Sequence, residues 1–364
     1  MLFGASGFTG RQTVRYFARH APTGLRWAIA GRDRQKLDAL RAPVDVLIAD
    51  AGNQASVDAV VSQTRVLVST AGPFAKYGTP VVDACVRVRT HYADITGETF
   101  WVQQLVDTYH ERASADRVRI VPCCGFDSVP SDIGAYLLAR HQRAEKVRGY
   151  FRFGGGGLNG GTVASVANLV ESKRAREVTR RDDFPPPHYD EWIGTWVGPF
   201  FMAPTNRWVV RRSATLFASW GEPYPDGFSY HEYLKYSPPL AAAKAIAGSS
   251  AIALAGVMLS VRPLFRAVRP LLPQPGSGPS EEQMNAGWFS CDVVGRTTAG
   301  ERVRAHLESR GDAGNRSTVK MLCESALCLA LHESTDRGGI LTPATAFGDH
   351  LVMRLRGAGM TVSQ

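Results

Sequence analysis

The stretch MLFGASGFTG, residues 1–10, places three glycines at positions 4, 7 and 10. The spacing G-x-x-G-x-x-G predicts a tight turn between a buried strand and a helix, with the first helical N–H groups directed at a phosphate. The strand would comprise residues 1–3 alone, whereas parallel strands usually have about 5–6 residues. A turn that binds no ligand is the alternative interpretation.

Three further strand-like runs follow at short intervals, namely LRWAIAGR (25–32), VDVLIAD (44–50) and RVLVSTAG (65–72). Predicted helices separate them. Strands that alternate with helices over short connections are typical of a doubly wound parallel sheet of the Rossmann type. Ligands of such sheets bind at the carboxyl ends of the strands, and four of these ends are residues 4–6, 31–32, 50–51 and 71–73.

The end of the second strand indicates which dinucleotide would bind. Folds that bind NAD usually place Asp or Glu there, whereas an arginine suits the 2′-phosphate of NADP(H). This chain has Gly31 and Arg32 at that position, and a guanidinium can bind a phosphate through two hydrogen bonds. Asp33 is interpreted as the N-cap of the next helix. The sequence favours NADP(H), and the alternative is a solvated basic helix start.

Length and composition limit the protein class. With 364 residues, of which 44% are hydrophobic, two domains are expected. The formal charge of +9 favours acidic partners such as phosphates, anionic lipid headgroups or an acidic carrier protein. No motif indicates nucleic-acid binding. Six cysteines without a C-x-x-C pair or a His/Cys cluster predict neither a metal site nor a disulfide framework. The opening residues form a cofactor loop rather than a signal peptide, which predicts a cytoplasmic protein.

Candidate catalytic residues lie between positions 91 and 132. Tyr92, in a predicted strand at 91–95, can donate a proton or a hydrogen bond. Asp127 and Ser128 follow the end of a later strand, where they would reach nicotinamide or substrate. The alternatives are that Tyr92 and its neighbour His91 belong to the core, that Ser128 and Asp132 cap a helix, and that Cys123 and Cys124 are small buried hydrophobes. A separate helix is expected to begin at Thr79 and Pro80.

With these segments in hand, the chain resembles the saccharopine dehydrogenase-like oxidoreductases, and among them the trans-acting enoyl reductase group. The resemblance is carried by GASGFTG, AGR followed by KL, AGPF, HYADITGE and CGFDSVPSD in this order and spacing. It is strong over residues 1–140 and resumes at GGT (160–162) and GGILTPATAFGDHL (338–351).

The resemblance implies a Rossmann domain with an inserted α+β substrate and dimerisation domain, and NADPH as cofactor. We therefore expect an NADP-binding domain at 1–130, the inserted domain at 131–335, and a segment at 336–364 that returns to the first domain. Carried over residue by residue, Asp50 lies near adenine, Arg32 at the 2′-phosphate, and Ala71, Gly72 and Pro73 near the nicotinamide ribose. The pyrophosphate loop comprises Gly4, Ser6, Gly7, Phe8, Thr9 and Gly10.

The second region holds three stretches with open interpretations. Residues 160–162 begin a helix that would bind an anion or would simply be capped. The basic stretch at 173–181 is a solvated face or a dock for an acidic acyl carrier protein. Within the apolar part at 238–276, residues 245–261 have no charge and form a buried or dimer-interface helix, a membrane-surface helix or a span. Residues 270–283 are expected to form a loop.

The favoured hypothesis is an NADPH-dependent enoyl reductase acting in trans for a polyketide synthase that lacks this activity. Its substrate would be a carrier-linked acyl chain destined for envelope glycolipids, and the enzyme would be a cytoplasmic homodimer, with the plasma membrane as a further candidate location. One alternative is an imine or amino-acid oxidoreductase like saccharopine reductase. The other is a non-catalytic protein that binds NADP, lipid or membrane.

Overall fold

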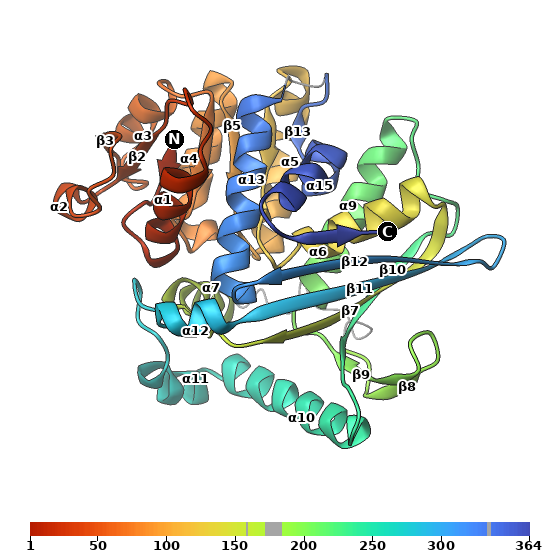
Figure 1. Ribbon diagram of the computed structural model, residues 1–364. Helices are drawn as coiled ribbons and strands as arrows, with labels where there is room; N and C mark the ends of the chain where they lie inside the picture. Colours follow the sequence, from red (N-terminus) through yellow and green to blue (C-terminus); the bar gives the residue numbers. More distant parts are fainter. Residues whose placement is uncertain (158, 172–183, 333–335) are drawn as a thin grey trace.

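The protein is described by a computed structural model that covers residues 1–157, 159–171, 184–332 and 336–364 (Figure 1). Its first sheet is entirely parallel, in the order β13-β6-β5-β4-β1-β2-β3. The predicted Rossmann-type sheet is therefore confirmed. Its strands are β1 Leu2–Phe3, β2 Ala28–Gly31, β3 Asp45–Ile48, β4 Val66–Ser69, β5 His91–Asp94, β6 Arg119–Val121 and β13 Gly339–Ile340.

Helices cover both faces of this sheet because successive strand residues point to opposite sides. Leu2 packs in one core cluster with residues of α1 and α13, whereas Phe3 packs in a second cluster with residues of α3, α4 and α5. Helix α2 is a single short turn near the edge. The bounds are α1 Phe8–His20, α2 Arg34–Asp38, α3 Gln54–Val61, α4 Phe74–Val88, α5 Thr99–Ala115 and α13 Thr318–Leu331.

A second, mixed sheet lies beside the first in the order β14-β12-β11-β7-β10-β9-β8 (Figure 1). Only the β7–β10 pair is parallel. Phe151, Cys291 and Leu307 point from this sheet into the core that it shares with the first domain. The strands are β7 Ala144–Gly154, β8 His188–Asp190, β9 Thr195–Pro199, β10 Ser229–Lys235, β11 Trp288–Thr297, β12 Arg302–Arg310 and β14 Thr361–Ser363.

The remaining helices connect and cover the two sheets. Their bounds are α6 Val129–Tyr136, η1 Leu137–His141, α7 Gly160–Glu171, α9 Ala203–Ser219, α10 Ala241–Ser260, α11 Arg262–Val268, η3 Arg269–Leu271, α12 Glu281–Ala286, η4 Ala313–Ser317, α14 Pro343–Phe347 and α15 Asp349–Gly357. The stretch expected as a loop at 270–283 contains the end of η3 and the start of α12. Helix α12 begins there because Ser280 and Gln283 cap each other reciprocally.

The carboxyl-terminal part of the chain contributes one strand to each sheet. Strand β13 pairs with β6 in the first sheet, whereas β14 pairs with β12 in the second. Helix α13, which precedes β13, packs against β4 and β5 of the first sheet. Residues 336–364 thus contribute to both sheets, and the domain boundaries at 130 and 335 stay predictions.

Candidate functional site

The glycine loop between β1 and α1 is held so closely that side chains would not fit. Gly4 has a φ of +81°, in the left-handed region, and a Cβ there would lie 2.9 Å from the Ala71 amide nitrogen. A Cβ at Gly10 would overlap the carbonyl oxygen of Gly4. A backbone turn without side chains is what allows a pyrophosphate to approach the first helical turn.

The N-terminus of α1 is open to an anion. Gly7 stands at the N-cap without a side-chain hydrogen bond, and the first turn contains no acidic residue. The Arg11 guanidinium donates a hydrogen bond of 2.9 Å to the carbonyl oxygen of Ser6, which adds positive charge beside the loop. Free N–H groups and the helix dipole both stabilise a phosphate at such an end. The loop predicted from residues 4–10, including Phe8 and Thr9, therefore has the geometry that a pyrophosphate needs.

Arg32 stands at the carboxyl end of β2, where the sequence predicts the 2′-phosphate. Its side chain is exposed, and in the described chain no hydrogen bond or ion pair holds its guanidinium. Its neighbour Gly31 is buried. Asp33 is the N-cap of α2, as predicted, because its carboxylate accepts a hydrogen bond of 3.1 Å from the Lys36 amide, which lowers its pKa. Asp33 is thus engaged with the helix, whereas Arg32 is available to a ligand.

Asp50 follows β3 on the same edge of the sheet. Its side chain accepts a hydrogen bond of 2.9 Å from the Gly52 amide, and the residue is exposed. The loop of Ala71, Gly72 and Pro73 follows β4, and all three residues are partly accessible. The structure therefore brings the predicted cofactor residues together at the carboxyl ends of β1 to β4. Their contacts with NADP(H) stay predictions.

A buried glutamate that the sequence did not single out organises the turn after β4. The Glu98 carboxylate accepts hydrogen bonds from the amides of Phe74 (2.9 Å) and Ala75 (3.2 Å), which are the first residues of α4. It also accepts from Ser165 Oγ (2.9 Å) and Asn168 Nδ2 (3.3 Å) on α7. Glu98 therefore connects the turn at residues 71–73 with a helix of the inserted region.

This contact also corrects the expected helix start at Thr79 and Pro80. Helix α4 begins at Phe74 and contains Pro80 in its interior, while Thr79 Oγ1 accepts a hydrogen bond from Trp101 Nε1. The true start is stabilised from outside by Glu98, which is distant along the chain. The only local signal was the Gly97-Glu98 pair at the exit of β5.

Asp127 lies beside this turn, after β6. A Cβ placed at Gly97 would be 4.0 Å from Asp127 Oδ2 and 3.6 Å from Met202 Cε. Burial raises the pKa of Asp127 to about 6. Within the described residues its carboxyl group has no hydrogen-bond or ion-pair partner. A half-buried carboxyl group with a raised pKa and no partner is typical of a group that exchanges a proton with a ligand.

Aromatic side chains contact Phe126, the residue that precedes Asp127. Phe126 contacts Phe153 with a ring separation of 6.4 Å, and Phe153 contacts Phe201 at 6.1 Å. Phe153 is 39% exposed and Phe201 is 48% exposed. Phe153 and Phe201 thus form an accessible apolar wall. Met202, which follows Phe201, reaches Gly97 and extends this wall toward the Asp127 carboxyl group.

The structure places Tyr92 and Ser128 in the interior. Tyr92 is fully buried and donates a 2.8 Å hydrogen bond to Asp94, whose pKa burial raises to about 7. Asp94 in turn accepts from the Cys123 amide and thereby holds the turn after β6. Ser128 is also buried and donates to Asn206 Oδ1 at 3.2 Å. Tyr92 thus has the core position of its structural alternative. Ser128 stands at the N-cap of α6 but its side chain makes no capping hydrogen bond there, and the Asp132 carboxylate accepts from the Ala344 amide of α14 instead.

The structure also bears on the interpretations of the two cysteines, of His91 and of the helix that begins at residue 160. Burial raises the pKa of the Cys123 and Cys124 thiols well above the ordinary value, as expected for buried hydrophobes. Burial lowers the pKa of His91 to about 4. Asn159 Oδ1 accepts a 3.0 Å hydrogen bond from the Thr162 amide and so caps α7. The basic stretch at 173–181 lies outside the described residues.

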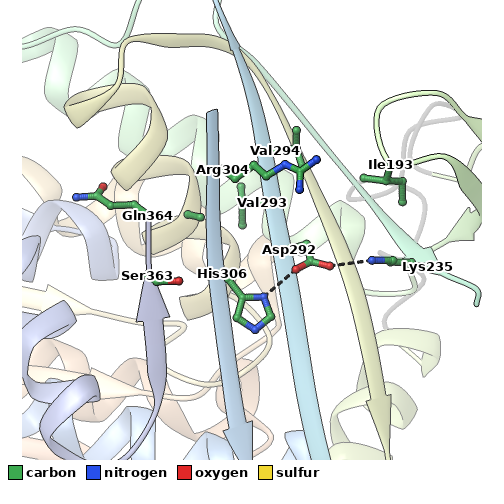
Figure 2. A pocket seen from close by; sticks show the side chains of 10 residues that line it. Ile193, Lys235, Asp292, Val293, Val294, Arg304, His306, Ser363 and Gln364 are labelled. Atoms are coloured by element: carbon green, nitrogen blue, oxygen red, sulfur yellow. Dashed lines mark hydrogen bonds and ion pairs between the residues drawn. The ribbon is translucent and has the colours of Figure 1, made fainter. Parts of the chain in front are cut away.

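A cavity of about 500 Å³ lies elsewhere, on the outer face of the second sheet (Figure 2). Asp292 lies at its centre and pairs with Lys235 Nζ at 3.0 Å and with His306 Nδ1 at 2.7 Å. None of the predicted site residues lines this cavity. In the described part of the chain, no three His, Cys, Asp or Glu side chains are grouped as metal ligands would be.

Comparison with known proteins supports the dinucleotide site. Residues 1–121 match the family described as saccharopine dehydrogenase NADP binding domain. The chain is 33% identical over 411 residues to the trans-acting enoyl reductase of Mycobacterium ulcerans, with 100% of this chain and 96% of that protein covered. It is 32% identical over 409 residues to the trans-acting enoyl reductase of Mycobacterium bovis, with the same coverage of 100% and 96%.

Two solved structures share the fold. The apo saccharopine dehydrogenase (L-Glu forming) of Saccharomyces cerevisiae aligns with a TM-score of 0.54 at 11% identity, over 100% of this chain and 99% of its own. The homospermidine synthase of Legionella pneumophila, in complex with NAD, aligns with a TM-score of 0.54 at 11% identity, over 100% and 90%. At this identity the likeness concerns the fold alone.

Proposed function

We infer the function from one premise, that this chain belongs to the trans-acting enoyl reductases within the saccharopine dehydrogenase-like oxidoreductases. We propose that it is an NADPH-dependent enoyl reductase that reduces a C=C bond of a carrier-linked polyketide or fatty acyl chain. The observation that carries the proposal is the convergence of two side chains at Gly97, beside the turn that Glu98 binds. One is Asp127, whose carboxyl group has no partner among the described residues, and the other is Met202, which continues the exposed apolar surface of Phe153 and Phe201.

The residues present fit the cofactor. The backbone approaches Gly4 and Gly10 so closely that neither position has room for a Cβ, and the uncapped start of α1 suits the pyrophosphate. Arg32 is the residue that we expect to bind the 2′-phosphate. NADPH bound at this edge would supply the hydride for the reduction.

Enoyl reduction also needs a proton for the α-carbon. We propose that Asp127 holds this proton, since its raised pKa of about 6 leaves more of the carboxyl group protonated near neutral pH than an ordinary aspartate would have, and no described group forms a hydrogen bond or ion pair with it. Tyr92 has no place in this step because Asp94 engages its buried hydroxyl group. Ser128 is assigned to positioning through Asn206.

The apolar wall indicates the substrate class. Phe153 and Phe201 offer exposed ring surface, and Met202 extends it toward Asp127, which suits a long acyl chain. An amino-acid substrate, as in the saccharopine reductase alternative, would need charged partners at this wall.

The partners and the location follow from the family and the charge. We propose that the acyl chain is presented by a polyketide synthase or an acidic acyl carrier protein, which the formal charge of +9 would attract. The product would enter envelope glycolipid biosynthesis. We further propose a cytoplasmic homodimer located at the plasma membrane as a peripheral protein, supported by the exposed apolar helix α10.

The direct test is single-turnover reduction of an α,β-unsaturated acyl thioester with NADPH deuterated on the transferred hydride. The expected product gains one deuterium and one solvent proton, as seen by mass spectrometry. Asp127→Asn should slow product formation while NADPH still binds. Reduction of an imine formed from a keto acid and an amine, with no reduction of the thioester, would contradict the proposal. Absence of NADPH binding would favour the non-catalytic alternative.

A further inference from the structure

Helix α10 is apolar but is not part of the core. By length and composition its residues Ala241–Met258 could span a membrane, and only 6% of this window is buried. Of the interpretations given above for this stretch, a helix buried inside the chain is therefore wrong, whereas a dimer interface, a membrane surface and a span stay open. Leu254 on α10 is 62% exposed, and Leu271 at the end of η3 is 85% exposed. Such a concentration of exposed apolar side chains indicates a binding surface.

The exposed apolar residues are concentrated in one segment. Seven of the fifteen large apolar side chains that are exposed in the described chain fall within residues 240–271. In Figure 1, α10 and α11 lie together at the lower edge of the molecule, below the second sheet. We call α10, α11 and η3 together the lower helical surface. The seven side chains are Leu240, Ile246, Leu254, Val257, Val261, Leu264 and Leu271.

One side of α10 is anchored by small residues. Ala245 is fully buried, and a Cβ at Gly248 would overlap the hydroxyl group of Tyr236. A Cβ at Gly198 of β9 would lie 2.8 Å from Ser249 Oγ. These contacts pack the first half of α10 against Tyr236 and β9, while residues 253–257 are all exposed. The helix is thus fixed in place with its apolar second half outward.

The charged residues of the same segment are all basic. Residues 240–280 contain four Lys or Arg and no Asp or Glu. Arg266 on α11 is exposed, and Phe265 beside it is buried and anchors that helix. Apolar side chains flanked by basic ones match the boundary between acyl chains and anionic headgroups. A second copy of this chain, itself positively charged, would offer poorer complementarity.

We propose that the lower helical surface binds an anionic lipid bilayer, with Leu254 and Val257 inserted at the headgroup boundary and Arg266 at the phosphates. The proposal specifies the contact behind the peripheral location proposed above and does not depend on the reduction chemistry. It also places the membrane near the substrate wall, because α10 packs against β9, which leads directly into Phe200 and Phe201.

The test is co-flotation of the full chain with vesicles of phosphatidylcholine alone or mixed with phosphatidylglycerol. The wild type should float with the anionic vesicles, and added salt should weaken the binding. Leu254→Glu should weaken partitioning at least about tenfold, because an apolar contact is lost and a charge is placed in the boundary. Arg266→Gln should weaken it about fivefold on anionic vesicles only.

Met353→Glu is the matched control, because Met353 is 55% exposed on α15 and receives the same change. Its partitioning should equal that of the wild type. Flotation of Leu254→Glu like the wild type, or no flotation of the wild type, would overturn the proposal. So would a dimer that dissociates with Leu254→Glu and vesicle binding that does not change. NADPH titration of the same variants tests the enzyme separately, and all should bind it normally.

Discussion

Replacing Arg32 by Ala removes the guanidinium that we expect to distinguish NADPH from NADH. Arg32 is exposed and its guanidinium makes no hydrogen bond or ion pair within the described chain, so its loss should change the free energy of unfolding by less than about 0.5 kcal/mol. A hydrogen bond to a charged group contributes about 1.5–3 kcal/mol. The dissociation constant for NADPH should therefore rise about tenfold to 150-fold, and that for NADH should stay within about twofold.

Arg34→Ala provides the matched control two residues away. Arg34 is exposed as well, but its Nε already pairs with both carboxylate oxygens of Asp38 at 3.0 Å. Removing that pair costs about 0.3–0.5 kcal/mol of stability and should leave both cofactor affinities unchanged. The assay is fluorescence titration of each protein with each nucleotide. Equal weakening of NADPH and NADH by Arg32→Ala would refute the assignment, as would a larger effect of Arg34→Ala on NADPH.

Three further predictions concern the loop, the turn and the proton. Gly10→Ala should destabilise the protein by about 1–3 kcal/mol and weaken the binding of both NADPH and NADH, because the added Cβ would overlap the Gly4 carbonyl oxygen. The control is Gly256→Ala, in an exposed helix where an added Cβ would have no atom within 4 Å; thermal unfolding should show this variant to be more stable by up to about 1 kcal/mol. Glu98→Gln should leave buried hydrogen-bond donors without an acceptor and lower the free energy of unfolding by about 1–3 kcal/mol. Titration calorimetry should show that the affinities for NADPH and NADH fall alike, in contrast to the selective loss of NADPH affinity in Arg32→Ala. Burial raises the pKa of Asp127 to about 6, so the protonated form is lost as pH rises through that value. The wild-type rate of enoyl reduction should therefore fall above about pH 6, whereas Asp127→Asn should be slow throughout, and a profile with the wild-type inflection in the variant would exclude Asp127 as the donor.

Much of the first sheet could be predicted because its signals are local. The glycine spacing at 4, 7 and 10 and the Asp33 cap each depend on a few consecutive residues. Alternating apolar strands and helices follow from the same short-range pattern. Arg32 could be named for the same reason, since the residue after the second strand has a defined place in this fold.

The start of α4 could not be predicted, because Glu98 stabilises it from 24 residues away. The surroundings of Asp127 were equally hidden, since Gly97 and Met202 come from separate parts of the chain. The burial of α10 could not be predicted either, because an apolar stretch of sequence does not show which other segments will cover it.

By itself the sequence determined the dinucleotide fold and the edge at which we propose that the cofactor binds, because these are set by spacing and by side-chain periodicity along the chain. Tertiary structure alone decided which carboxyl groups have hydrogen-bond partners and which apolar side chains are exposed to solvent. Asp94 is bound by Tyr92, whereas Asp127 has no hydrogen-bond or ion-pair partner in the part of the chain that the structure describes. Ala245 is buried whereas Leu254 is exposed. Partners and burial are properties of contacts between distant segments, and they exist only once both sheets have formed.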